Sequence, residues 1–215
     1  MAEAKRKQAD YHHGRLAETL MALAVKRIAR EGAPAFTLRE LAAEAGVTHA
    51  ATYRHFASRE ALLAAIAAAG YRELREREEA AQRVAGDDPW ARLLVLPETY
   101  LAFMADAPGT FHVMLGHRWA DDDTYAEARA ARAESYALLE ATAVECQNAG
   151  VLPEGDPARL IAAMLGVTHG LASLWLSGQL GVVAGGAEMN GLVRETVRAS
   201  FEAFRASDGI LWGSA

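Results

Sequence analysis

Apolar residues recur at spacings of three and four along almost the whole chain, which is the spacing of one face of an α-helix. A first stripe runs from Leu16 to Ile28 and stops at Gly32, with Pro34 two residues further on. Clusters of β-branched residues are few, and the segments between glycines and prolines are rich in Ala, Leu, Glu and Arg. The pattern predicts an all-α protein.

Helix-start residues divide this pattern into about nine helices, three of them in the N-terminal part. Thr37 and Glu40 form a capping box before a short second helix that ends at Gly46. Thr48 can cap a third helix, which runs to about Phe56, and Ser58 can cap a fourth. The later helices are expected over residues 59–84, 89–106, 108–118, 122–149, 157–179 and 189–206. Residues 181–191, which include four glycines, are expected to be a flexible connection.

Charge is distributed unevenly along the 215 residues, whose net charge is -6. Residues 1–60 carry ten Lys and Arg against seven Asp and Glu, whereas residues 61–215 carry twelve against twenty-one. A basic start before an acidic remainder favours a polyanionic partner at the N-terminal end. The division also suggests two domains, over residues 1–60 and 61–215.

The composition favours a cytoplasmic protein. Cys146 is the only cysteine, so an internal disulfide is excluded, and a buried apolar role is expected for it, with a sensor thiol as the alternative. We find no stretch of roughly 20 uninterrupted apolar residues such as a membrane helix needs, and no signal-peptide core follows Lys5, Arg6 and Lys7. We therefore expect no membrane partner.

The segment FTLRELAAEAGVTHAATYRHFASREALL, residues 36–63, has the pattern of a helix-turn-helix. A short helix with a small, apolar face precedes Gly46, which can adopt the positive φ of a tight turn, and Val47 can fill the space beneath it. On the helix that follows, Phe56 and one edge of Tyr53 can pack inward while the tyrosine hydroxyl stays free.

The outward side chains of that second short helix suit DNA. His49, Thr52 and Arg54 can reach phosphates or base edges, while the small Ala50 and Ala51 allow the helix to lie deep in the major groove. Helix starts at Thr48 and Ser58 and the charge of Arg59 favour phosphate oxygens. The alternative is a three-helix packing unit whose polar residues are merely solvated.

Residues 11–66 resemble the DNA-binding domain of the TetR (tetracycline repressor) family, which has a glycine turn, Ser or Thr, a short helix ending in Tyr-x-His-Phe, and then Lys-x-x-Leu. The matching positions are Gly46, Thr48, Tyr53, His55, Phe56, Arg59 and Leu62. The start YHHGRL and the sequence Thr168-His169-Gly170-Leu171-Ala172 are similar to a subgroup with a WHG-type C-terminal domain. Arg59 stands where the family usually has lysine, so the geometry of its contact differs.

This resemblance implies a role for each matched position of the N-terminal domain. Phosphate contacts are implied for Thr37, Thr48, Tyr53, His55 and Arg59, and base contacts for His49, Ala50, Thr52 and Arg54. Lys5 to Lys7 would form an arm that reaches a minor groove or further phosphates, or else a solvated tail.

For residues 61–215, the resemblance implies a helical domain that binds a small molecule and forms a homodimer. The helices over 157–179 and 189–206 could pair with their copies in a four-helix bundle, or use the same apolar residues in an intramolecular core. A hydrophobic or aromatic effector would suit the candidate pocket residues, which are Phe103, Met104, Phe111, Met114, His117, Trp119, Cys146, His169 and Trp175.

Enzymatic motifs are absent from the sequence. We find no phosphate-binding glycine loop, no Gly-x-Ser-x-Gly turn and no credible set of metal ligands, and we expect no cofactor. The resemblance implies a ligand-responsive regulator, by default a repressor released from a palindromic double-stranded operator by its effector, with the helix over 59–84 as the lever. The alternative is a helical interaction module that keeps the fold without sequence-specific DNA binding.

Overall fold

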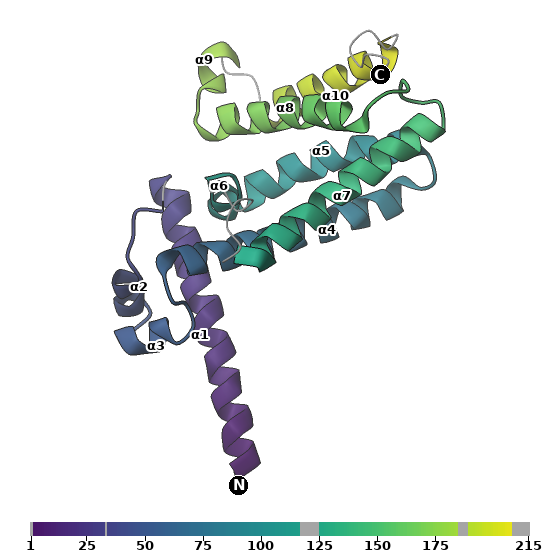
Figure 1. The fold of residues 1–215 in the computed structure, drawn as a ribbon. Helices are drawn as coiled ribbons and strands as arrows, with labels where there is room; N and C mark the ends of the chain where they lie inside the picture. The colour runs from purple at the N-terminus through teal and green to yellow at the C-terminus, as the bar shows by residue number, and fades with distance from the viewer. Residues whose placement is uncertain (1, 33, 117–124, 185–188, 208–215) are drawn as a thin grey trace. The chain divides into compact units, whose positions relative to one another are not determined.

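The computed structural model describes residues 2–32, 34–116, 125–184 and 189–207 (Figure 1). Within these ranges the chain forms helices and no strand, so the predicted all-α class is confirmed. The helices are α1 (Ala2–Glu31), α2 (Leu38–Glu44), α3 (His49–Tyr53), α4 (Arg59–Ala85), α5 (Pro89–Asp106), α6 (Pro108–Gly116), α7 (Ala126–Asn148), α8 (Pro157–Leu176), α9 (Leu180–Ala184) and α10 (Met189–Ala206).

Three segments differ from the expectation. Lys5 to Lys7 lie inside α1, which begins at Ala2, and so do not form an arm preceding the first helix. Leu180–Ala184 forms the short helix α9 within the segment expected to be a flexible connection. Helix α8 ends at Leu176, earlier than predicted, because Ser177 is the C-cap and Gly178 takes a φ of 72°.

The local start and stop signals act as the sequence predicts. Thr37 and Glu40 form both hydrogen bonds of a capping box, and Thr48 accepts from the amide of Ala51. Ser58 accepts from the amide of Ala61 at 3.0 Å. Each cap satisfies amides that the first turn of a helix leaves without an intrahelical partner.

The contacts between residues divide the chain into two compact units, Met1–Tyr71 with Ala107–Arg132, and Arg72–Asp106 with Ala133–Ala215. One boundary between the units lies within α4 and another lies within α7, so each of these helices contributes to both units. The domain boundary at residue 60 stays a prediction.

In the first unit, α1 packs closely against α6. Gly109 makes this approach possible, because a Cβ atom there would lie 2.2 Å from the carbonyl oxygen of Val25. Nearby, the hydroxyl of Tyr71 donates to the carbonyl of Met114 at 3.1 Å. The first unit therefore contains a close contact between α1 and α6.

In the second unit, α5 packs against both α8 and α10, and α8 lies alongside α10 (Figure 1). Its core contains fully buried side chains from these helices, such as Phe103, Leu93 and Phe201. Trp90 donates from its indole nitrogen to Glu202 at 3.1 Å. The apolar residues of α10 thus pack into an intramolecular core, in which Val193 and Val197 are also buried.

Helix α8 buries only one narrow face in this core. Leu160, Met164, Thr168 and Ala172, four apart, are buried, while Leu174 is 39% exposed. By length and composition this is the one described helix that could cross a membrane, and 22% of that stretch is buried. The described helices therefore leave part of the apolar surface of α8 uncovered.

Candidate nucleic-acid interface and ligand cavity

The turn between α2 and α3 has the geometry of a helix-turn-helix. Gly46 adopts a φ of 68°, a conformation that side-chain-bearing residues rarely take. The amide of Val47 donates to the carbonyl of Ala42 at 2.9 Å, which closes the end of α2. Thr48 then starts α3 only two residues after the glycine. The backbone of this turn thus ends α2 and starts α3 within a few residues, and the two short helices pack against each other.

Helix α3 exposes most of the side chains that the sequence assigned to DNA. His49, Ala50 and Arg54 are exposed, and Tyr53 is 47% exposed. The rings of His49 and Tyr53 meet edge to face with centroids 4.5 Å apart, which restricts both side chains. Phe56 is buried, as its place in the motif predicts.

Thr52 is the exception on this helix and corrects the sequence interpretation. Its side chain is completely buried and does not face outward with its neighbours. Its hydroxyl has no hydrogen-bond partner among the residues that the structure describes. Helix α3 packs against α1 and α2, and Thr52 lies on its buried side.

The residues expected at phosphates surround this face. Thr37 and Thr48 are exposed, and their hydroxyls accept from helix amides, which leaves each hydroxyl hydrogen for another acceptor. Arg59 is half-buried and donates to the carbonyl of Pro34 at 3.0 Å and to Glu60. His55 is half-buried. Contact of these residues with DNA stays a prediction.

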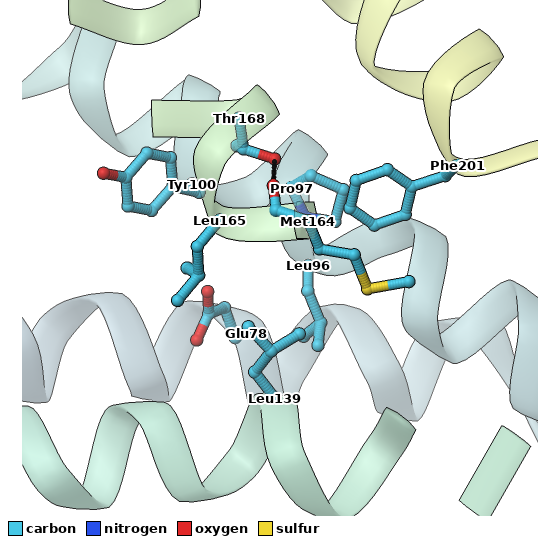
Figure 2. Close-up of a pocket in the computed structure, with 9 residues that line it drawn as sticks. All are labelled: Glu78, Leu96, Pro97, Tyr100, Leu139, Met164, Leu165, Thr168 and Phe201. Carbon is cyan, nitrogen blue, oxygen red and sulfur yellow. Dashed lines mark hydrogen bonds between the residues drawn. The ribbon is translucent and has the colours of Figure 1, made fainter. Parts of the chain in front are cut away.

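The second unit contains a cavity between α4, α5, α7, α8 and α10 (Figure 2). It holds about 350 Å³ of empty space, including its open mouth. Its walls are mostly aliphatic and aromatic, and the lining residues are Glu78, Leu96, Pro97, Tyr100, Leu139, Met164, Leu165, Thr168 and Phe201. Such a wall, with few polar groups, is typical of a site for a small apolar molecule.

Glu78 is the one charged residue of this lining. It is 8% exposed, and burial raises the pKa of its carboxyl to about 8. Figure 2 shows the carboxyl among the apolar side chains of Leu96, Leu139 and Leu165. Desolvation is the cause of the shift, which means that the carboxyl gains nothing from a neighbouring cation.

A second polar pair borders the cavity. The hydroxyl of Tyr100 lies 2.8 Å from Nδ1 of His169, and burial lowers the pKa of this histidine. The hydroxyl of Thr168 donates to the carbonyl of Met164 at 2.9 Å, the dashed line in Figure 2. Both lining hydroxyls are thus already engaged, which sets them apart from Glu78.

Of the nine candidate pocket residues from the sequence, the seven that the structure describes do not line this cavity. Phe103, Met104, Phe111 and Met114 are buried core residues, and the last two belong to the first unit. Trp175 is half-buried on α8, His169 reaches the cavity only through Tyr100, and His117 and Trp119 lie outside the described residues. A role for these nine residues as ligand contacts stays a prediction.

Cys146 is packed in the core of the second unit. Its side chain is completely buried, and Sγ donates to the carbonyl of Pro89 at 3.1 Å. Burial raises the pKa of the thiol to about 12, so the thiolate that redox sensing requires is not formed near neutral pH. The structural role expected from the sequence therefore fits this position better than that of a sensor.

Glu78 could have been found from the sequence. Leu63, Ala67, Tyr71, Leu74 and Glu78 follow one another at spacings of three and four along α4, and all five are buried. The signal was hidden because Glu78 lies in an acidic stretch that looks like a solvated helix face. Within the described ranges, no cluster of three His, Cys, Asp or Glu side chains could hold a metal ion.

The exposed helix after a glycine turn and the helical domain with an open cavity fit a DNA-binding regulator. Comparison with known families agrees: residues 20–66 match the model of bacterial regulatory proteins of the tetR family, and residues 93–200 match a tetracyclin repressor-like C-terminal domain. The chain belongs to the TetR family of transcriptional regulators, which are not enzymes. Membership of the WHG-type subgroup was not shown.

Solved structures with the same fold include several regulators. A protein of unknown function from Rhodococcus sp. RHA1 is 30% identical, with a TM-score of 0.76 over 91% of this chain and 98% of that one. The TetR family regulator PfmR from Thermus thermophilus is 21% identical, with a TM-score of 0.68 over 85% and 97%. The fatty acid degradation regulator FadR from Bacillus halodurans is 17% identical, with a TM-score of 0.68 over 85% and 96%. The comparison with curated proteins gave no match.

Proposed function

We propose that this TetR-family regulator is a repressor that binds a palindromic operator as a homodimer and is released by a small apolar effector. One observation carries the proposal: the exposed face of α3 and the cavity lining are connected by the continuous helix α4. The helix begins at Arg59, six residues after the end of α3, and supplies Glu78 to the cavity. An effector that prefers one placement of α4 would therefore change DNA affinity.

The DNA-reading surface in this proposal is the exposed side of α3. His49, Tyr53 and Arg54 provide donors for bases and phosphates. The small side chain of Ala50 allows the helix to approach base edges. Thr37, Thr48, His55 and Arg59 would flank it at phosphates. Thr52 is not part of this surface, because its side chain is buried and cannot contact DNA bound to α3.

The unpartnered surface of α8 supports the homodimer. Leu174 is 39% exposed, and a Cβ atom at Gly166 or Gly170 would meet open space. Two copies of such a surface can approach closely because the glycines, four residues apart, carry no side chains. Pairing would also cover the apolar stretch that makes α8 resemble a membrane helix. A dimer is what a palindromic operator requires, because its half-sites are related by a two-fold axis.

Selection of fragmented genomic DNA on the purified protein, at near-physiological salt, tests this function. The expected result is an enriched palindrome with half-sites about one helical turn, roughly 34–36 Å, apart. Arg54→Ala should weaken the enrichment, whereas Arg194→Ala, which removes an equal charge from an exposed position of α10, should not. Retention without sequence preference would contradict the proposal and favour an interaction module.

A further inference from the structure

The carboxyl of Glu78 lies buried without the partner that such a group ordinarily has. Ionised side chains are rarely this buried unless they are paired, because the low-dielectric interior penalises the charge. One turn further along α4, Gln82 is buried too, but it donates to Thr142 at 2.8 Å. No hydrogen bond or ion pair of Glu78 is found within the described ranges. Of these two buried polar residues of α4, Gln82 therefore has a hydrogen-bond partner and Glu78 does not.

Each helix packed around Glu78 presents uncharged groups to it. Helix α7 contributes Leu139 and α10 contributes Phe201, while α5 and α8 add aliphatic residues and the two hydroxyls already engaged. Among the described residues, the titratable groups there are Tyr100 and the half-buried His169 bonded to it.

The arginines nearest to Glu78 in sequence are used elsewhere. On α4 itself, Arg75 pairs with Glu79 at 2.8 Å and with Glu134 at 2.9 Å. Arg77 is held by Glu73 and Asp106. The two arginines of α4 that lie nearest to Glu78 in sequence are therefore held by other carboxylates, and neither is bonded to Glu78.

We propose that the effector is an apolar organic cation whose ammonium group pairs with Glu78 while its hydrocarbon part lies against the leucine and aromatic wall. The inference rests on the proposed function, in which this cavity is the effector site. A charge-assisted hydrogen bond among apolar side chains is stronger than a neutral one, so this single contact would select amines over alcohols and carboxylates of equal shape.

The ionisation of Glu78 gives the proposal a pH signature. With a pKa of about 8, the carboxyl of the empty cavity is mostly protonated at pH 7, and an arriving ammonium ion displaces that proton. Cation affinity should then rise about tenfold per pH unit between pH 6 and pH 7. The affinity of a neutral alcohol should stay constant over the same interval.

Three probes of matched shape test the inference: 4-phenylbutylamine, 4-phenylbutanol and 4-phenylbutanoate. Isothermal titration calorimetry of the full-length protein, in two buffers of different ionisation enthalpy, measures both affinity and proton release. The wild type should prefer the amine and release close to one proton per amine bound at pH 7. Glu78→Gln should lose roughly tenfold to 100-fold in amine affinity at pH 8.5 and keep its affinity for the alcohol. Glu76→Gln, an exposed control on the same helix, should behave as the wild type.

The outcomes separate the inference from the function on which it rests. Equal binding of amine and alcohol, without proton release, would overturn the cation and leave the cavity as an effector site. Binding of none of the probes would overturn the inference and the assignment of this cavity together, while DNA selection would still report on the regulator. A pH dependence that persists in Glu78→Gln would assign the titration to His169 and also overturn the inference.

Discussion

Burial of Glu78 should make the protein's stability fall as the pH rises, and Glu78→Gln should remove this effect. The carboxyl has a pKa of about 8 in the folded chain against an ordinary value of 4.5. Because the folded state binds the proton more tightly, the stabilisation is fully present below pH 4.5 and is lost progressively as the pH rises toward 8. Each pH unit in that window corresponds to about 1.4 kcal/mol, so the wild type should lose roughly 2–3 kcal/mol from this group between pH 5 and pH 7.

Urea unfolding of the wild type and of Glu78→Gln, at both pH values and one protein concentration, measures this difference. The stability of Glu78→Gln relative to the wild type should increase by the same roughly 2–3 kcal/mol from pH 5 to pH 7. Contributions from His169 and the other titrating groups cancel in this comparison, and Glu76→Gln provides the exposed control. An unchanged difference between the two pH values would refute the buried, unpaired state of the carboxyl.

Three further predictions concern packing and reactivity. Gly109→Ala should lower the free energy of unfolding by about 2 kcal/mol or more, because the new methyl group meets the carbonyl of Val25. Gly116→Ala is the control, since this glycine lies in open space on the same helix, and it should be nearly neutral. Urea unfolding measures both. Thr52→Val should keep operator affinity and gain up to about 1 kcal/mol of stability, because it removes a buried hydroxyl without a hydrogen-bond partner. Weaker operator binding in a titration would show that Thr52 reaches DNA. Cys146 should react with a disulfide reagent only after unfolding, and rapid labelling of the native protein would contradict its burial.

The features that the sequence predicted well depend on neighbouring residues. The capping box at Thr37, the cap at Thr48 and the positive φ of Gly46 are set by hydrogen bonds and steric limits within a few residues. The helix-turn-helix could therefore be predicted in detail, and matching residues at fixed spacing then indicated the family.

The features that the sequence missed depend on which side of a helix faces the core. Thr52 looked like a base-reading residue because threonine suits that task, but the short helix α3 turns it inward. Glu78 looked solvated because its neighbours are charged, although its spacing from Leu74 places it on the buried stripe. The cavity was missed because its lining comes from five helices far apart in sequence, and no local pattern encodes which of their apolar residues leave space between them.

The most direct test of the central claim is a hydroxyl-radical footprint of the wild-type protein on a fragment recovered from genomic DNA. If two copies each place α3 in a major groove, the footprint should show two symmetric protected half-sites whose centres are about 10 base pairs, or a small multiple of one helical turn, apart. A single protected patch, or even protection along the whole fragment, would contradict a dimeric, sequence-specific regulator.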